Sequence, residues 1–259
     1  MVSLLCALAL MPVTYKIPAQ PVNYDLDIKF DGFIPIFGGT DGTAELKVGL
    51  AVKGLAPEEG DSNPRASTDV TDLKVLLQDQ MMPFTKDSVQ KWFPNTVTLT
   101  PLGKVLKTDA PNIEVPVQLP GLDIKRFPEV SFLAIEFPAE GIEQGKAWTY
   151  SRQFGESTVA YTVTPTSIAD GRVEMILKLT QNYEGHEDEA HSLVKDIKDA
   201  VADVKTHVEG SGTVVFDSAA GLIRALHMEA NAASASTDLK TKAVTTHNLK
   251  TTEDVVLRG

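Results

Sequence analysis

Histidines and carboxylates cluster at residues 186–191, HEDEAH, a pattern close to the zinc-binding H-E-x-x-H helix. Two zinc ligands on one helix face need histidines four residues apart, whereas His186 and His191 are five apart. Because a helix advances about 100° per residue, five residues turn the second side chain away by roughly 140°. We interpret the pattern as a solvated helix start and predict no metal site there.

Two glutamates occupy equivalent positions in similar segments, Glu45 in 42–50 and Glu174 in 171–179. Paired carboxylates can perform acid–base chemistry when they share one cleft. Each glutamate, however, alternates with apolar neighbours, which indicates a strand whose acidic side faces solvent. We therefore interpret both as surface residues.

The sequence contains none of the short motifs that commonly mark catalysis or cofactor binding. It has no G-x-S-x-G elbow, no G-x-x-x-x-G-K-[ST] loop, and no G-x-G-x-x-G between a strand and a helix. Ser211 lies between two glycines, which is a turn pattern rather than the setting of a nucleophile. We predict no catalytic residue, no metal and no cofactor, and we do not expect an enzyme.

Composition narrows the class of protein further. The chain has 259 residues, an apolar fraction of 42% and a formal net charge of −11. The apolar fraction is enough for a folded core, and the acidity argues against nucleic-acid binding, which needs a basic face. Cys6 is the single cysteine, so neither an internal disulfide nor a cysteine-based metal site can form.

The N-terminal segment predicts export. Residues 2–11 form an apolar run that is too short to span a bilayer but fits the core of a signal peptide. A charged start is missing, so the signal is degenerate or truncated; the alternative is a frayed apolar N-terminus on a cytosolic protein. The large residue Leu5 before Cys6 disfavours lipid anchoring. We expect an export signal and extended lead-in over 1–20, a location in the periplasm or cell envelope, and no transmembrane span.

Alternating apolar and polar residues predict a β-rich domain over 21–259. In 24–30, YDLDIKF, every second side chain is apolar, which is typical of a half-buried antiparallel strand. Residues 70–78 are ambiguous between strand and helix. Further strands are expected at 43–52, 129–137, 147–154, 158–164, 172–180, 213–216, 222–228, 236–249 and 255–257.

One long amphipathic helix is expected over 187–208. Its apolar residues recur at spacings of three and four, acidic residues precede them and basic residues follow. The apolar stripe consists of Leu193, Val194, Ile197, Val201, Val204 and Val208.

An internal duplication is also predicted. Residues 212–228 contain two strand-like runs around a turn that ends in Gly221, and 95–107 repeat this hairpin with Gly103. Residues 42–50 align with 171–179 without a gap. The two halves, about 21–125 and 126–259, would join edge to edge in one curved sheet or form two lobes; either arrangement removes exposed edges.

A resemblance supports this architecture. The strand entry containing Gly145, Trp148 and Tyr150, followed by the hairpin at 212–222, resembles exported bacterial proteins of unknown function. Their fold is expected to be similar to the half-barrel of lipoprotein carriers, a curved antiparallel sheet with helices over its concave face. The resemblance implies a concave apolar surface, which holds lipid or acyl chains in carrier relatives.

The predicted fold is mostly β (α+β): a strongly curved antiparallel sheet or half-barrel, duplicated, with the long helix packed on it. The predicted function is non-catalytic binding of an apolar ligand, such as a lipid or acyl chain, or of an envelope protein partner. The alternative is a structural or interaction protein whose concavity is filled. The apolar loop 33–37 is either a binding surface or membrane contact, or a core plug under the sheet. The candidate ligand contacts are Phe33, Ile34, Ile36, Phe37, Trp92, Phe93, Trp148, Leu193, Ile197 and Val201.

Overall fold

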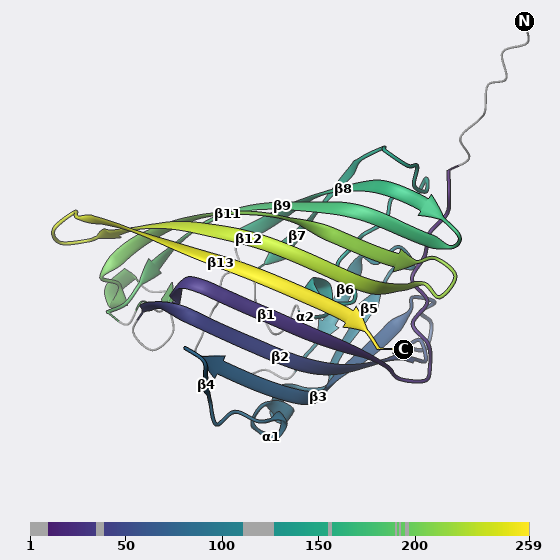
Figure 1. Cartoon of the computed structure of the whole chain (residues 1–259), viewed down its shortest axis with the longest axis horizontal. Helices are drawn as coiled ribbons and strands as arrows, with labels where there is room; N and C mark the ends of the chain where they lie inside the picture. Colours follow the sequence, from purple (N-terminus) through teal and green to yellow (C-terminus); the bar gives the residue numbers. More distant parts are fainter. Residues whose placement is uncertain are drawn as a thin grey trace, which may run out of the picture.

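The computed structural model describes residues 10–34, 39–110, 127–154, 157–189, 191, 193–194 and 197–258. These residues form one 13-stranded antiparallel sheet (Figure 1). Eleven strands follow one another in the order β6-β5-β3-β2-β1-β13-β12-β11-β9-β8-β7, with β4 beside β3 and β10 beside β9. The order has two ends, β6 and β7, so the sheet is not closed on itself. The prediction of a mostly-β fold built on one antiparallel sheet is confirmed.

The elements have the following bounds. The strands are β1 Val22–Ile34, β2 Thr40–Leu55, β3 Arg65–Leu77, β4 Gln80–Met81, β5 Asn95–Leu99, β6 Val105–Asp109, β7 Trp148–Phe154, β8 Ser157–Ala169, β9 Arg172–Glu187, β10 Leu193–Val194, β11 Ala202–Asp217, β12 Leu222–Asp238 and β13 Val244–Leu257. The helical segments are α1 Lys86–Val89, η1 Gln90–Trp92, α2 Phe127–Val130 and η3 Ile197–Asp199.

The first and last long strands lie side by side in the middle of the sheet. β1 pairs with β13 from Tyr24 opposite Leu257 to Gly32 opposite Leu249. Strands of both sequence halves therefore belong to one continuous sheet rather than to two lobes. The duplication of the halves stays a prediction.

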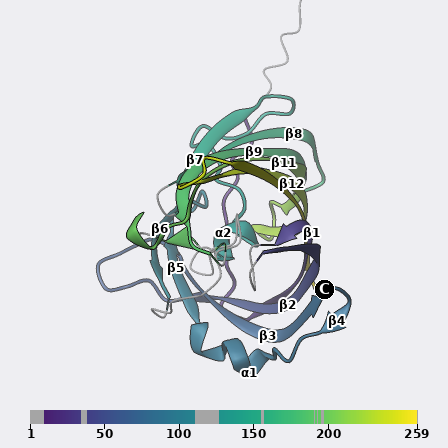
Figure 2. The same cartoon turned by 90° about the vertical axis from the view of Figure 1, so that its left-hand side faces the viewer.

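The alternation of β1 fixes which face of the sheet is buried. Tyr24, Leu26 and Ile28 are at most 2% exposed, whereas the intervening Asp25 and Asp27 lie on the opposite face. Because side chains alternate along a strand, the same register carries the apolar face across the neighbouring strands. Figure 2 shows that the sheet curves around α2, and we call the face toward α2 the concave face.

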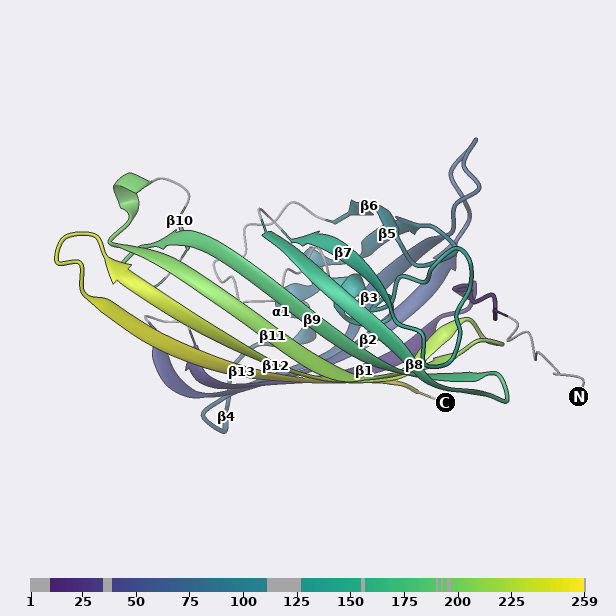
Figure 3. The ribbon, with the colours of Figure 1, turned by 90° about the horizontal axis from the view of Figure 1, so that it is seen from above.

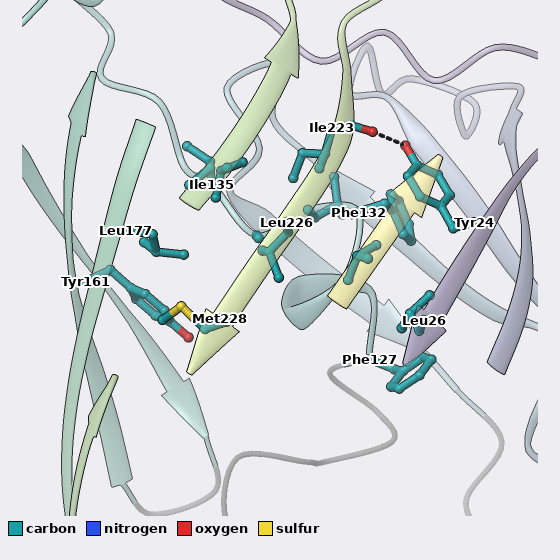
Figure 4. Packing of buried hydrophobic residues seen from close by; sticks show 14 of the residues in the cluster. Tyr24, Leu26, Phe127, Phe132, Ile135, Tyr161, Leu177, Ile223, Leu226 and Met228 are labelled. Atoms are coloured by element: carbon teal, nitrogen blue, oxygen red, sulfur yellow. Dashed lines mark hydrogen bonds between the residues drawn. The ribbon is translucent and has the colours of Figure 1, made fainter. Parts of the chain in front are cut away.

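Residues 127–137, which we call the plug, lie against this concave face. Phe132, Leu133, Ile135 and Phe137 are at most 4% exposed. The Tyr24 and Phe132 rings pack with centroids 6.0 Å apart, and the Tyr24 hydroxyl donates to the Ile223 carbonyl at 3.1 Å (Figure 4). The plug fills the end of the concavity where β1 begins.

The prediction of a strand at 129–137 is wrong. This stretch ends α2 and continues as turn and irregular backbone, because its consecutive apolar residues are all buried instead of alternating. Its carbonyl groups find side-chain donors in place of a neighbouring strand: Tyr15 donates to Ile135 O at 3.0 Å and Trp148 Nε1 to Glu136 O at 2.8 Å.

The predicted long helix over 187–208 is also wrong. Among the described residues no helix reaches seven residues. This stretch contains the last residue of β9, then β10, η3 and the first half of β11, and Figure 3 shows β9, β11, β12 and β13 running alongside one another. Ala202, Val204 and Val208 are buried while Lys205 and His207 are exposed. Buried residues thus recur at every second position, as in a β-strand. The β-branched valines of this stretch favour a strand.

Both predicted hairpins are present. β11 and β12 are joined at Asp217, whose Oδ1 accepts from the Ala220 N–H at 2.7 Å, and Gly221 has φ 70°. β5 and β6 are joined by a turn in which Gly103 has φ 91°. Glycine is favoured at these two positions because it adopts a positive φ without the steric cost that a Cβ atom would add. The ambiguous segment 70–78 belongs mostly to β3.

Candidate ligand-binding site

A cavity of about 90 Å³ lies on the concave face. Its walls are mainly apolar and come from seven strands and α2, with Ile28, Val130, Leu179 and Met228 among the lining residues. Figure 4 shows Met228 of β12 and Tyr161 of β8 pointing toward one another across this region. An apolar cavity with a few polar groups is the usual form of a small-molecule site.

Strand register places one carboxyl group in this apolar wall. Glu253 of β13 lies opposite Ile28 on β1 and opposite Met228 on β12. Thr251, two residues earlier on the same face, lies opposite Ala230. Both polar side chains therefore belong to the lining of the cavity.

The Glu253 carboxyl is the most perturbed acid on this face. Its Oε1 is shielded from solvent and has no hydrogen-bond partner, although the residue as a whole keeps some exposed surface. Burial, and to a lesser extent the neighbouring Asp254 carboxylate, raises the pKa of Glu253 to about 8. An unpaired buried carboxylate is costly, so the group is mostly protonated at neutral pH.

Two other polar residues of the lining, Gln181 and Tyr161, contact neighbouring side chains. Gln181 Nε2 donates to Ser157 Oγ at 2.5 Å, which directs the amide of Gln181. The Tyr161 ring stacks on Tyr150 with centroids 4.8 Å apart. These contacts orient the Gln181 amide and the Tyr161 ring.

A buried ion pair stands between the cavity strands and the plug. Arg152 Nε lies 3.5 Å from Glu129 Oε2, and both side chains are at most 4% exposed. The same guanidinium donates to the carbonyls of Glu129 and Leu133 at 2.8 and 2.7 Å and lies over the Tyr150 ring at 5.2 Å. Burial raises the pKa of Tyr150, so its hydroxyl stays a donor to Ala134 O.

Of the predicted contacts in the 33–37 loop, Phe33 and Ile34 are described, and neither lines the cavity. Ile34 is 2% exposed and part of the core. Phe33 stacks on His247 with centroids 3.7 Å apart and meets His191 edge-on at 5.2 Å. Ile36 and Phe37 lie outside the described residues.

Two of the three other predicted aromatic contacts, Phe93 and Trp148, also lie outside the cavity lining. Phe93 is partly buried and packs on the core, and Trp148 uses its indole N–H to hold the plug. Trp92 belongs to η1, but its side chain lies outside the described part of the structure. Neither Phe93 nor Trp148 lines the cavity.

The three contacts predicted from the long helix do not share a helical face, because the described part of 187–208 contains no helix of seven or more residues. Ile197 of η3 is 58% exposed. The Val201 N–H donates to the Glu187 carbonyl at 2.7 Å, and Leu193 belongs to β10, where its side chain is outside the described part.

The histidines of the HEDEAH pattern point to different partners. His186 Nδ1 lies 2.7 Å from Asp203 Oδ1, and His191 Nδ1 lies 3.3 Å from Glu187 Oε2. Within the described residues no group of three or more potential metal ligands is found.

The two equivalent glutamates are not brought together either. Glu45 of β2 lies 3.1 Å from Lys47 Nζ on the convex face, and Glu174 of β9 lies 3.1 Å from Arg172 Nε. Four strands separate β2 from β9 in the sheet. The chain does not use them as a carboxylate pair.

Glu253 is the residue that sequence reasoning missed. Only 255–257 and 236–249 are expected as strands, which leaves Glu253 between them. The signal was nevertheless present: Leu249, Thr251, Glu253 and Val255 alternate with polar residues, so they share the apolar face of one strand. Acidic side chains are rarely found among the buried apolar residues of a strand, so an acid at this position points to a role other than packing.

Neither a comparison with protein-family models nor a search of curated proteins finds a match for this chain. Among the described residues no helix has the length and apolar character needed to cross a membrane.

Proposed function

We propose that this chain is a non-catalytic binding protein for an apolar or amphiphilic small molecule, which it holds on the concave face of its sheet. The observation that carries the proposal is the apolar cavity with an unpartnered, solvent-shielded carboxyl oxygen of Glu253 in its wall. Apolar walls supply the driving force through burial, and a single polar group orients the ligand.

The size of the cavity limits what it holds. An apolar cavity of about 150 Å³ accommodates benzene. The cavity of about 90 Å³ therefore suits a segment of one alkyl chain rather than a whole lipid. The head of such a ligand would lie beside Glu253. The resemblance to lipoprotein carriers and the location in the cell envelope stay predictions within this proposal.

A probe of cavity occupancy tests the proposal. A fluorescent probe that carries a neutral dansyl amide dye at the head of a ten-carbon alkyl chain is added to the purified chain, and decanol is used as a competitor. We expect dye fluorescence to rise with protein and to fall as decanol displaces the dye. The variant Ala230→Leu fills the cavity wall on β12 and should weaken dye binding about tenfold, since filling a pocket removes space for the ligand.

Ala233→Leu provides the matched control, because Ala233 lies on the same strand but is exposed on the other face. It should bind dye like the unmodified chain. Absence of dye binding by the unmodified chain, or equal binding by Ala230→Leu, would contradict the proposal, provided that circular dichroism shows both variants folded.

The second candidate is a structural or interaction protein, and the plug favours it. Phe132, Leu133 and Ile135 already fill one end of the concavity with the chain's own residues. This alternative predicts that the alkyl-chain dye does not bind, and that crosslinking in whole cells traps a protein partner instead.

A further inference from the structure

We infer that the ligand head recognised beside Glu253 is an aliphatic ammonium group, so that the cavity selects cationic amphiphiles over neutral or anionic ones of the same chain length. This inference rests on the proposed function and names the chemical class of its ligand.

Two oxygens of the cavity lining, Glu253 Oε1 and the Gln181 amide oxygen, can accept a hydrogen bond from a ligand. Glu253 Oε1 has no hydrogen-bond partner. The Gln181 amide nitrogen is directed to Ser157, which leaves the carbonyl oxygen of the same amide for another donor. An ammonium group offers three donors and no acceptor, whereas a carboxylate head offers only acceptors. The ammonium head is thus complementary to this lining.

The charges around Glu253 favour a cation from outside the protein. On the concave face, β1 and β12 present Ile28 and Met228 to it, and Tyr161 is the other ionisable side chain of the lining. Arg152 of β7 is already paired with Glu129 of α2. No lining residue is basic, so a carboxylate ligand would find no counter-ion.

On the convex face the flanking charges are already paired. Asp254 lies 2.7 Å from His227, and Lys250 lies 3.1 Å from Glu229. On β1, Lys29 lies 3.4 Å from Asp27. The net charge of −11 attracts cationic ligands to the chain as a whole.

Binding couples to one proton. At neutral pH the Glu253 carboxyl holds its proton, because its pKa is raised to about 8. When an ammonium head arrives, the carboxyl releases that proton to solvent and the resulting carboxylate pairs with the cation. A charge-assisted pair in a low-dielectric site stabilises the ionised form and lowers the pKa of the acid in the complex.

Isothermal titration calorimetry with decylamine, decanol and decanoate on the full chain tests the inference. At pH 7, in two buffers of different ionisation enthalpy, decylamine should bind about tenfold or more tightly than decanol, with release of about one proton per ligand. Decanol should release none. Glu253→Gln should bind decylamine and decanol with similar affinity and release no proton.

Glu229→Gln is the matched control, because it removes an exposed acid from the convex face of the neighbouring strand. It should keep both the preference and the proton release, whereas non-specific attraction to an acidic surface would persist in Glu253→Gln as well. Equal affinities for amine and alcohol in the unmodified chain, or a preference for decanoate, would overturn the inference and leave the proposed function standing. If none of the three ligands binds, both fail.

Discussion

Two ionisable side chains on the concave face, Arg152 and Glu253, differ in whether their polar atoms have partners. Arg152 has a carboxylate, two carbonyls and two aromatic rings around it. Glu253 Oε1 has no partner. A buried polar group without a partner costs free energy, so its presence in an apolar wall calls for a role. Arg152 explains how the plug is held, and Glu253 marks the place where we propose that a ligand binds.

Glu253 should make stability depend on pH. Its pKa is raised from 4.5 to about 8 in the folded chain. Below pH 4.5 the carboxyl is protonated in both the folded and the unfolded state. Between pH 4.5 and about 8 only the folded state keeps the proton. The free energy of unfolding therefore falls as pH rises through this range, by up to about 1.4 kcal/mol per pH unit. Above pH 8 this loss is complete.

Glu253→Gln should therefore be more stable than the unmodified chain at pH 8, by roughly 1–3 kcal/mol, with a smaller difference at pH 5. Urea unfolding at both pH values measures the two differences. Glu229→Gln should show no comparable gain at pH 8. A difference for Glu253→Gln that is the same at both pH values would contradict the raised pKa.

Arg152 should contribute far more stability than a similar arginine at the surface. Arg152→Met leaves Glu129 buried without its cation and should cost about 3–5 kcal/mol of unfolding free energy. Arg172→Met breaks the Arg172–Glu174 pair, whose arginine is 61% exposed, and should cost less than about 1 kcal/mol. Denaturant midpoints of the two variants give the comparison, and similar small losses would show that the pair is not buried in solution.

At the scale of elements, the plug contains the stretch 129–137 that was predicted as a strand, and it lies on the concave face, where the helix over 187–208 was predicted to pack. Five carbonyl groups, those of Glu129 and of residues 133–136, accept hydrogen bonds from side chains of β7 and from Tyr15. Irregular backbone can be buried only when its polar groups are satisfied in this way. The sheet side chains thus determine the path of the plug.

Removing the largest buried side chain of the plug tests that placement. Phe132→Ala should lower the free energy of unfolding by about 3–5 kcal/mol, because Phe132 is 1% exposed and packs on Tyr24. Phe84→Ala should change stability by no more than about 0.5 kcal/mol, since Phe84 is 42% exposed. Chemical denaturation distinguishes the two, and equal effects would place Phe132 outside the core.

The elements that could be predicted from the sequence are those in which buried and exposed residues alternate regularly along the strand. β1 and the hairpins of β5–β6 and β11–β12 have clear alternation and turn residues, and they were located correctly. The helix over 187–208 failed because valines at 201, 204 and 208 satisfy the helical spacing by chance, while Val204, Thr206 and Val208 follow the spacing of two. The strand prediction for 129–137 failed because its consecutive apolar residues are all buried, so that polar and apolar residues do not alternate.

At the scale of the molecule, the pairing of β1 with β13 joins both ends of the chain in one sheet. This pairing creates the cavity, whose lining comes from strands as distant in sequence as β1, β8 and β13. No local pattern encodes such a neighbourhood, which is why the site could not be predicted although the curved sheet was. The predicted contacts were the conspicuous aromatic residues, and the cavity instead uses Ile28, Met228 and Glu253.

The central claim is that a ligand occupies this cavity, and photolabelling with an alkylamine that carries a diazirine at its chain end tests it most directly. After irradiation, peptide mass spectrometry locates the labelled residues. We expect labels on Ile28, Leu179 and Met228 and their loss when decylamine is added as a competitor. Labels confined to exposed apolar residues such as Val244 and Val256, unaffected by decylamine, would contradict the claim.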